Sequence, residues 1–198
     1  MTALLLIVTL AAAPKQDGLD RLAAALGSAE AWQAEFVQVY TPEGFVEGTT
    51  DGGRLTLVPP ALLRFDYTSG SPRAFAADGS VGRLVDPAAG SCDAVRLDVG
   101  AWGRLPLAAL LDPPAARRVF TVESRGATLR LLPREPNPEL AEIIVNLDLK
   151  GMPAVVTVRD TTGNSNRFSF SRWKPAPKPP GAFFRPALPG SPPCSPDQ

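Results

Sequence analysis

Hydrophobic and polar residues repeat with two different periods along the chain. Residues 17–26 place leucine and alanine at i, i+3, i+4 and i+7, which predicts an amphipathic helix that ends at Gly27. From Trp32 onward the apolar residues recur at every second position, as in a strand with one buried face. The change of period predicts a short helix followed by a β-sheet.

Short alternating segments, separated by turn residues such as Asp78-Gly79, then fill most of the chain. The predicted strands are 32–40, 45–50, 54–58, 62–67, 74–77, 81–86, 92–99, 119–123, 128–132, 143–149, 154–159 and 166–173. No crossover helix separates them, which predicts an antiparallel meander. Because open sheets rarely stay flat beyond about ten strands, we expect a mainly β (α+β) fold with a curved sheet. The helix at 17–26 and a short apolar helix at 105–111, ending before Pro113, would cover one face.

The two ends of the chain differ from this pattern. Residues 1–13 contain an apolar run of signal-peptide length and an A-x-A cleavage pattern. The pattern is atypical, since no Lys or Arg precedes the run and Pro14 follows the expected cut. We therefore predict export to the periplasm, one domain at 14–174, and an extended Pro-rich tail at 175–198 that stays out of the central strands. Phe183 and Phe184 are the tail's candidates for docking on the domain.

Composition limits the possible chemistry. The 20 Lys and Arg residues balance 20 Asp and Glu residues without a basic cluster, which argues against nucleic-acid binding. The sequence has no histidine, so Ser-His-Asp and Cys-His catalytic sites and His-containing zinc sites are excluded. A carboxylate pair or a Ser/Lys dyad is still possible in principle, but no local motif indicates either. We predict a non-catalytic protein without a metal or cofactor.

The two cysteines, Cys92 and Cys194, lie far apart in the sequence and in no C-x-x-C motif. In an oxidising compartment they are able to form one disulfide that ties the tail to the domain. The sequence leaves this alternative and a pair of free thiols both open, because the Cα separation is not encoded in spacing.

Several short motifs occur in a fixed order between Leu19 and Pro186. They are F-x-Q at 36–38, LLRFDY at 62–67, A-D-G at 77–79 before LVDP at 84–87, PLAALL at 106–111, LLP at 131–133, D-x-x-G-N at 160–164 and F-x-x-P at 183–186. In this order they resemble the periplasmic outer-membrane lipoprotein carrier family (LolA-like). D-x-x-G-N does not meet the EF-hand pattern and is interpreted as a turn before a strand.

The resemblance implies an unclosed half-barrel of antiparallel strands with a helical lid. It also implies a monomer that takes lipoproteins from an inner-membrane, ABC-type release complex and passes them to an outer-membrane receptor. One position departs from the family, because Pro59 stands where the family has an arginine that contacts the lid. The gating role of that arginine is therefore not carried over.

Alternating apolar positions predict the residues that would line an acyl-chain cavity: Phe36, Leu55, Leu57, Phe65, Tyr67, Val145, Leu147, Val156, Val158, Phe168 and Phe170. The predicted lid residues are Leu19, Leu22, Leu26, Leu107, Leu110 and Leu111. The same stripes would equally form a packed core beneath the helices, and it is the resemblance that favours a cavity. The predicted function is a carrier of lipoprotein or other lipid acyl chains, and the alternative is a lipid-sensing regulator or adaptor on the same fold.

Overall fold

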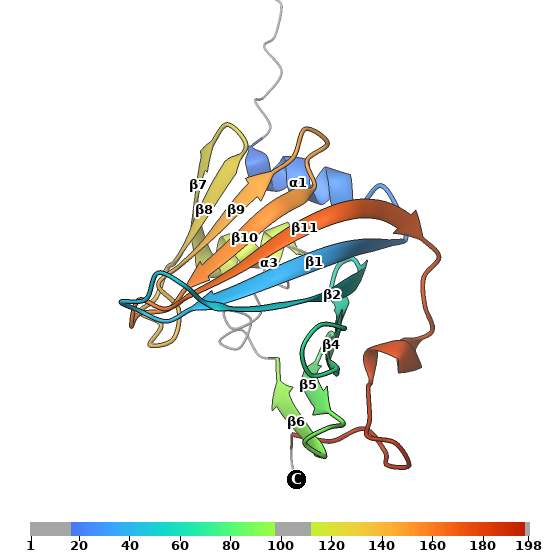
Figure 1. Ribbon diagram of the computed structural model, residues 1–198. Coiled ribbons are helices and arrows are strands. Elements are labelled where there is room, and N and C mark those ends of the chain that lie inside the picture. Colours follow the sequence, from blue (N-terminus) through green and yellow to red (C-terminus); the bar gives the residue numbers. More distant parts are fainter. Residues whose placement is uncertain (1–16, 98–111, 197–198) are drawn as a thin grey trace, which may run out of the picture.

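The computed structural model describes residues 17–97 and 112–196, which form one curved, unclosed antiparallel sheet with few helices (Figure 1). The strands are β1 (Ala31–Thr41), β2 (Thr49–Val58), β3 (Leu62–Tyr67), β4 (Arg73–Asp78), β5 (Val81–Asp86), β6 (Ser91–Arg96), β7 (Phe120–Arg125), β8 (Thr128–Pro133), β9 (Glu142–Leu147), β10 (Pro153–Arg159) and β11 (Ser165–Ala176). The helices are α1 (Gly18–Leu26), α3 (Pro113–Val119) and the 3₁₀ helix η2 (Gly181–Phe184). The predicted fold class is confirmed.

Two predicted features lie outside the described residues. One is the signal peptide at 1–13, and the other is the helix at 105–111 with its lid residues Leu107, Leu110 and Leu111.

Two consecutive meanders build the sheet, in the order β6-β5-β4-β3-β2-β1-β11-β10-β9-β8-β7. They join where the first and last strands pair, with Phe36 of β1 opposite Phe170 of β11. Among the described strands, β6 and β7 form the two edges. The centre of the sheet is thus made from the two ends of the domain, which brings residues more than a hundred positions apart onto one face.

One prediction about local structure was wrong, and one helix was missed. Residues 45–50 do not form a separate strand, because β2 runs unbroken from Thr49 to Val58 and Phe45 lies in the preceding turn. The glycines at 52–53 suggest a break, yet they continue the strand in register with β1. The sequence pattern also missed α3, which begins at Pro113 and is capped by Asp112 accepting a hydrogen bond from the Ala115 N–H. Proline fits the first turn of a helix because its missing N–H has no partner there.

Helix α1 lies against the inner face of the sheet, behind its upper strands in Figure 1. Asp17 caps the helix by accepting a hydrogen bond from the Asp20 N–H. The Gly18 N–H donates to Ser124 Oγ of β7 at 3.1 Å, and a Cβ at Gly18 would lie 2.4 Å from Leu129. At the other end, Trp32 Nε1 donates to the Leu26 carbonyl at 2.8 Å. A side chain at position 18 would therefore require the Leu129 side chain or α1 to move.

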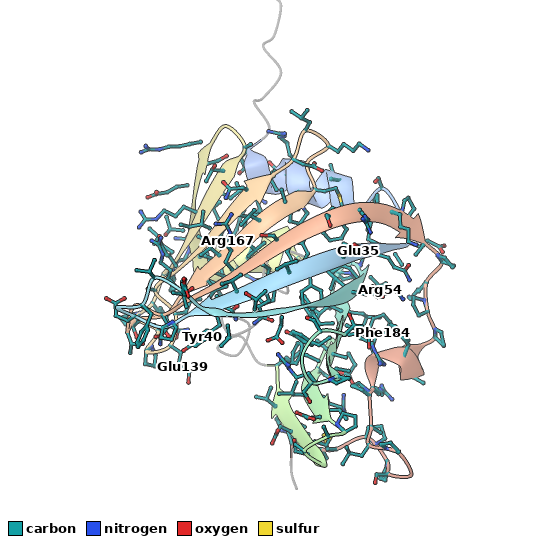
Figure 2. The ribbon with its side chains drawn as sticks, viewed as in Figure 1. Glu35, Tyr40, Arg54, Glu139, Arg167 and Phe184 are labelled. Atoms are coloured by element: carbon teal, nitrogen blue, oxygen red, sulfur yellow. A yellow bond between two sulfur atoms is a disulfide. The ribbon has the colours of Figure 1, made fainter. Side chains whose placement is uncertain are left out.

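The C-terminal segment, residues 177–196, lies on the outer face. β11 runs to Ala176, two residues past the domain end expected at 174, and the chain then passes along β3 to β6 (Figure 1). Phe184 of η2, labelled in Figure 2, is fully buried in a small cluster with Ala31 and Val58. The expected extended tail is therefore docked on the domain.

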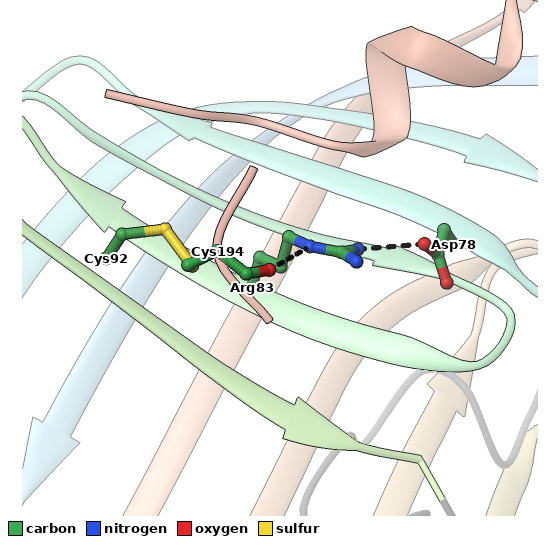
Figure 3. The surroundings of a disulfide bond; sticks show 4 residues. All are labelled: Asp78, Arg83, Cys92 and Cys194. Carbon is green, nitrogen blue, oxygen red and sulfur yellow. Dashed lines mark hydrogen bonds and ion pairs between the residues drawn. A yellow bond between two sulfur atoms is a disulfide. The ribbon is translucent and has the colours of Figure 1, made fainter. Parts of the chain in front are cut away.

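Figure 3 shows how the end of this segment is fixed. Cys194 forms a disulfide with Cys92 of β6, so the structure contains the bridge rather than two free thiols. Arg83 Nε donates to the Cys194 carbonyl at 2.9 Å, and the same guanidinium bonds to Asp78 at 2.8 Å. The disulfide and this hydrogen bond from Arg83 thus hold the segment to β5 and β6, and Arg185 of the segment lies 3.3 Å from Asp78 of β4.

Candidate lipid-binding face

The predicted cavity residues share the inner face of the sheet. Strand pairing places Leu55 opposite both Ala34 and Phe65, and Val156 opposite both Val145 and Phe168. Directly opposed residues point to the same side of a sheet. Of the predicted set, Tyr67 and Val158 are half-buried, and the others are buried in one hydrophobic cluster. These buried members are Phe36, Leu55, Leu57, Phe65, Val145, Leu147, Val156, Phe168 and Phe170.

The helix supplies the other side of this cluster. Leu19, Leu22 and Leu26 of α1 are 0%, 0% and 2% exposed and belong to the same hydrophobic cluster as the sheet residues. The structure therefore brings the predicted lining and the first predicted lid into contact. In this structure the helix's own leucines occupy space over the inner face.

An unbroken series of aromatic rings runs along the inner face. Neighbouring ring centroids are 5.0 to 6.5 Å apart, most of them edge-to-face or tilted. The series is Tyr67, Phe36, Phe65, Phe168, Phe170, Trp173 and Trp32. It crosses β1, β3 and β11 and forms a continuous apolar floor.

Glycine makes room for part of this floor. Gly53 lies directly between Phe36 and Tyr67 in the strand register. A Cβ there would come within 1.9 Å of the Asp66 carbonyl oxygen. Glycine therefore lets β2 and β3 approach closely here, where the Phe36 and Tyr67 rings meet edge-to-face with centroids 5.1 Å apart.

Sequence reasoning missed some members of the cluster. Leu129 and Leu131 of β8 are completely buried beneath α1 and follow the same alternation that identified Val145 and Leu147. The period-two pattern was therefore sufficient to find them. Trp173 is different, because a bulge between β1 and β11 changes the register just before it.

The inner face becomes polar at one end. Arg73 bonds to Asp51 at 2.8 Å and its guanidinium lies 4.2 Å from the Tyr67 ring centroid. The Tyr67 hydroxyl donates to Gln38 Oε1 at 2.7 Å, and Gln38 Nε2 donates to Asn166 Oδ1 at 2.9 Å. Burial, modified by the nearby charges of Arg73 and Asp51, raises the pKa of Tyr67 to about 12, so the phenol is a neutral donor at physiological pH.

Helix α1 is held to α3 by exposed charges. Arg117 of α3 contacts Asp17 at 2.9 Å and Asp20 at 2.7 Å. Burial would raise the pKa of Asp17, but hydrogen bonds from the Asp20 N–H and Arg117 outweigh it and lower that pKa. Exposed ion pairs are weak, so most of the attachment of α1 comes from its three leucines.

A pocket of about 350 Å³ lies elsewhere, beside the C-terminal segment. Arg64 and Val85 of the outer face line it, together with Pro186 and Ala187 of the C-terminal segment. Tyr67 is also among its lining residues. Arg64 is already paired with Asp66 at 2.8 Å. This pocket does not correspond to the predicted acyl-chain cavity.

Within residues 17–97 and 112–196, no cluster of His, Cys, Asp and Glu side chains is placed to hold a metal ion. The Asp160 carboxylate instead accepts hydrogen bonds from the Thr162 and Asn164 backbone N–H groups, which makes D-x-x-G-N a turn before β11. No helix in the same ranges is long and apolar enough to span a membrane.

Comparison with known families identifies the chain. The sequence model described as "Outer membrane lipoprotein carrier protein LolA" matches residues 27–187. This chain belongs to the LolA family. The resemblance found in its motifs is thereby confirmed. LolA-family proteins are periplasmic and are binding or carrier proteins rather than enzymes. No curated protein sequence matches the LolA-family chain.

Solved structures similar to the chain include MucB, with 18% identity and a TM-score of 0.47 over 86% of this chain and 62% of MucB. A LolA superfamily protein from Nitrosomonas europaea has 9% identity and a TM-score of 0.47, covering 86% of this chain and 98% of that one. LppX of Mycobacterium tuberculosis has 9% identity and a TM-score of 0.42, covering 81% and 95%. The chain thus spans less than two thirds of MucB, and the family assignment rests on the sequence model.

Proposed function

We propose that this LolA-family protein is a periplasmic carrier that binds acyl chains of lipoproteins or another lipid on the inner face of its sheet. The observation that carries the proposal is the position of α1, whose three leucines cover an aromatic floor through non-covalent contacts. The carrier accepts its lipid from an inner-membrane, ABC-type release complex and delivers it to an outer-membrane receptor.

The free energy gained by burying an acyl chain and the free energy lost by exposing the leucines of α1 are of similar size. An acyl chain gains about 0.8 kcal/mol for each CH₂ removed from water, so a chain of about sixteen carbons gains on the order of 10 kcal/mol. Exposing Leu19, Leu22 and Leu26 costs roughly 2 kcal/mol each. A guest that displaces α1 therefore binds with a surplus of only a few kcal/mol, which permits both uptake and release.

Locking α1 in place tests the proposal. The Ala25 Cβ lies 3.3 Å from the position of a Cβ built on Gly151, in the turn between β9 and β10. This separation is slightly shorter than the usual disulfide range of about 3.5–4.5 Å, and a cysteine at Gly151 strains the turn because φ there is +83°, so the reduced double variant must bind like the wild type for the test to count. In Ala25→Cys/Gly151→Cys, the oxidised protein should no longer bind a fluorescent long-chain fatty acid, and reduction should restore binding.

Two controls make the result specific. The single Ala25→Cys variant has no partner for the lock and should bind in both redox states. The wild type, treated with the same reductant, measures any effect of opening the native Cys92–Cys194 bridge. Undiminished binding by the locked protein would exclude an inner-face site that opens by movement of α1.

The regulatory alternative predicts a different partner. A regulator would be retained by an inner-membrane protein whether or not it carries lipid, whereas a carrier should lose its lipid to outer-membrane acceptor vesicles. Mass spectrometry of the protein purified from a periplasm, before and after incubation with such vesicles, separates the two functions.

A further inference from the structure

The inner face has two chemically distinct ends. Along β1 the side chains that point inward are Trp32, Ala34, Phe36 and Gln38. Six residues of strand span about 20 Å, so the face changes from tryptophan to amide over roughly that distance. Tyr40, labelled in Figure 2, continues β1 beyond the polar end.

The tryptophan end offers no free hydrogen-bond donor from its indoles. Trp32 Nε1 donates to the Leu26 carbonyl at 2.8 Å, and Trp173 Nε1 donates to the Pro153 carbonyl at 2.9 Å. The aromatic rings, the leucines of α1 and the other apolar side chains of the same cluster are what this end presents to a guest. This end therefore suits hydrocarbon.

The other end offers donors without a net charge. Arg73 is neutralised by Asp51, and Tyr67 is a neutral phenol. Gln38 and Asn166 are half-buried, and Asn166 uses its carbonyl oxygen to accept from Gln38. Its amide hydrogens then point to no protein acceptor among the described residues, so they are free to bind carbonyl oxygens of a guest.

We infer that the inner face fixes the direction of its lipid, with ester or amide carbonyls at the amide groups of Gln38 and Asn166 and the methyl ends beside Trp32 and Trp173. The inference rests on the proposed carrier function and specifies how the guest lies. The reverse orientation buries carbonyls among groups that have no donor to give, which disfavours it by about tenfold or more.

Tryptophan quenching tests the direction. The sequence contains three tryptophans, so Trp102→Phe leaves only Trp32 and Trp173 as reporters at the apolar end. Fatty acids brominated near the methyl end should then quench more fluorescence at saturation than fatty acids brominated near the carboxyl group. Equal quenching, or the opposite order, with binding intact overturns the inferred direction.

A matched pair of variants identifies the residues responsible. Gln38→Leu, made in the Trp102→Phe protein, should reduce the difference between the two brominated lipids while binding persists. Gln33→Leu places the same change on the outward-pointing side of β1 and should leave the difference unchanged. If neither brominated lipid binds, the carrier function itself fails, a result distinct from bound lipid without orientation.

Discussion

Helix α1 and the C-terminal segment cover opposite faces of one sheet, and they are attached in different ways. α1 is held on the inner face by three buried leucines, a few hydrogen bonds and exposed ion pairs. The C-terminal segment is held on the outer face by a buried phenylalanine, a disulfide, the hydrogen bond from Arg83 to the Cys194 carbonyl and the contact of Arg185 with Asp78. The outer cover is fixed by a disulfide, whereas the side-chain contacts of the inner cover are non-covalent, as the proposed exchange of lipid requires. Stability and lipid exchange should therefore respond to different substitutions.

The largest stability effect should follow loss of the disulfide. Cys92→Ser/Cys194→Ser opens a link between residues 102 positions apart, and removing a loop constraint of that length costs about 4 kcal/mol. Urea unfolding should therefore have a lower midpoint for this double variant than for the wild type. The rate of fatty-acid release should stay the same, because the bond lies on the outer face; a faster release would show that the two covers are coupled.

Truncating the lid should change both properties. Leu22 is completely buried, so Leu22→Ala should cost about 3 kcal/mol and accelerate fatty-acid uptake, because α1 then opens at lower cost. Stopped-flow fluorescence measures the uptake rate.

The matched control is Phe184→Ala on the outer face, where the side chain is also completely buried. Its stability loss should be at least as large, and its uptake rate should equal that of the wild type. Equal acceleration by both variants would mean that general destabilisation, not lid opening, controls uptake.

Acid should weaken the outer attachment. Burial would raise the pKa of Asp78, but hydrogen bonds from Arg83, Val81 and Ser80 outweigh it and hold that pKa well below its ordinary value of 3.8. Because the folded-state pKa is depressed, this stabilisation is complete above the unfolded value and is lost as pH falls through the folded one. Asp78→Asn should lower stability at neutral pH by about 2 kcal/mol and flatten the acid dependence measured by urea unfolding. If the stability of the variant falls with pH below 3.8 as steeply as that of the wild type, Asp78 is not the source of the acid dependence.

The residues of the inner face were easier to predict from the sequence than the contacts between distant segments of the chain. Alternation in β2, β3 and β9 identified Leu55, Phe65 and Val145 because a strand with one buried side must repeat every two residues. The pairing of β1 with β11 was not predicted, since it joins distant segments and depends on tertiary packing. Phe184 was expected to dock on the domain, but its neighbours Ala31 and Val58 were not predicted, because a Pro-rich composition says nothing of what the chain contacts.

The smallest effect should come from the charges between α1 and α3. Arg117 contacts Asp17 and Asp20 in an exposed position, so Arg117→Gln should cost only about 0.5 kcal/mol. The rate of fatty-acid uptake is the more informative measurement. Salt screens exposed charges, so added salt should speed fatty-acid uptake by the wild type and leave the variant's uptake unchanged.

The matched control is Arg172→Gln, which removes a comparable exposed pair with Glu35, away from α1, and should keep the wild-type salt response. A salt response that survives in Arg117→Gln would mean that these charges do not restrain the lid, leaving the three leucines as its attachment to the sheet.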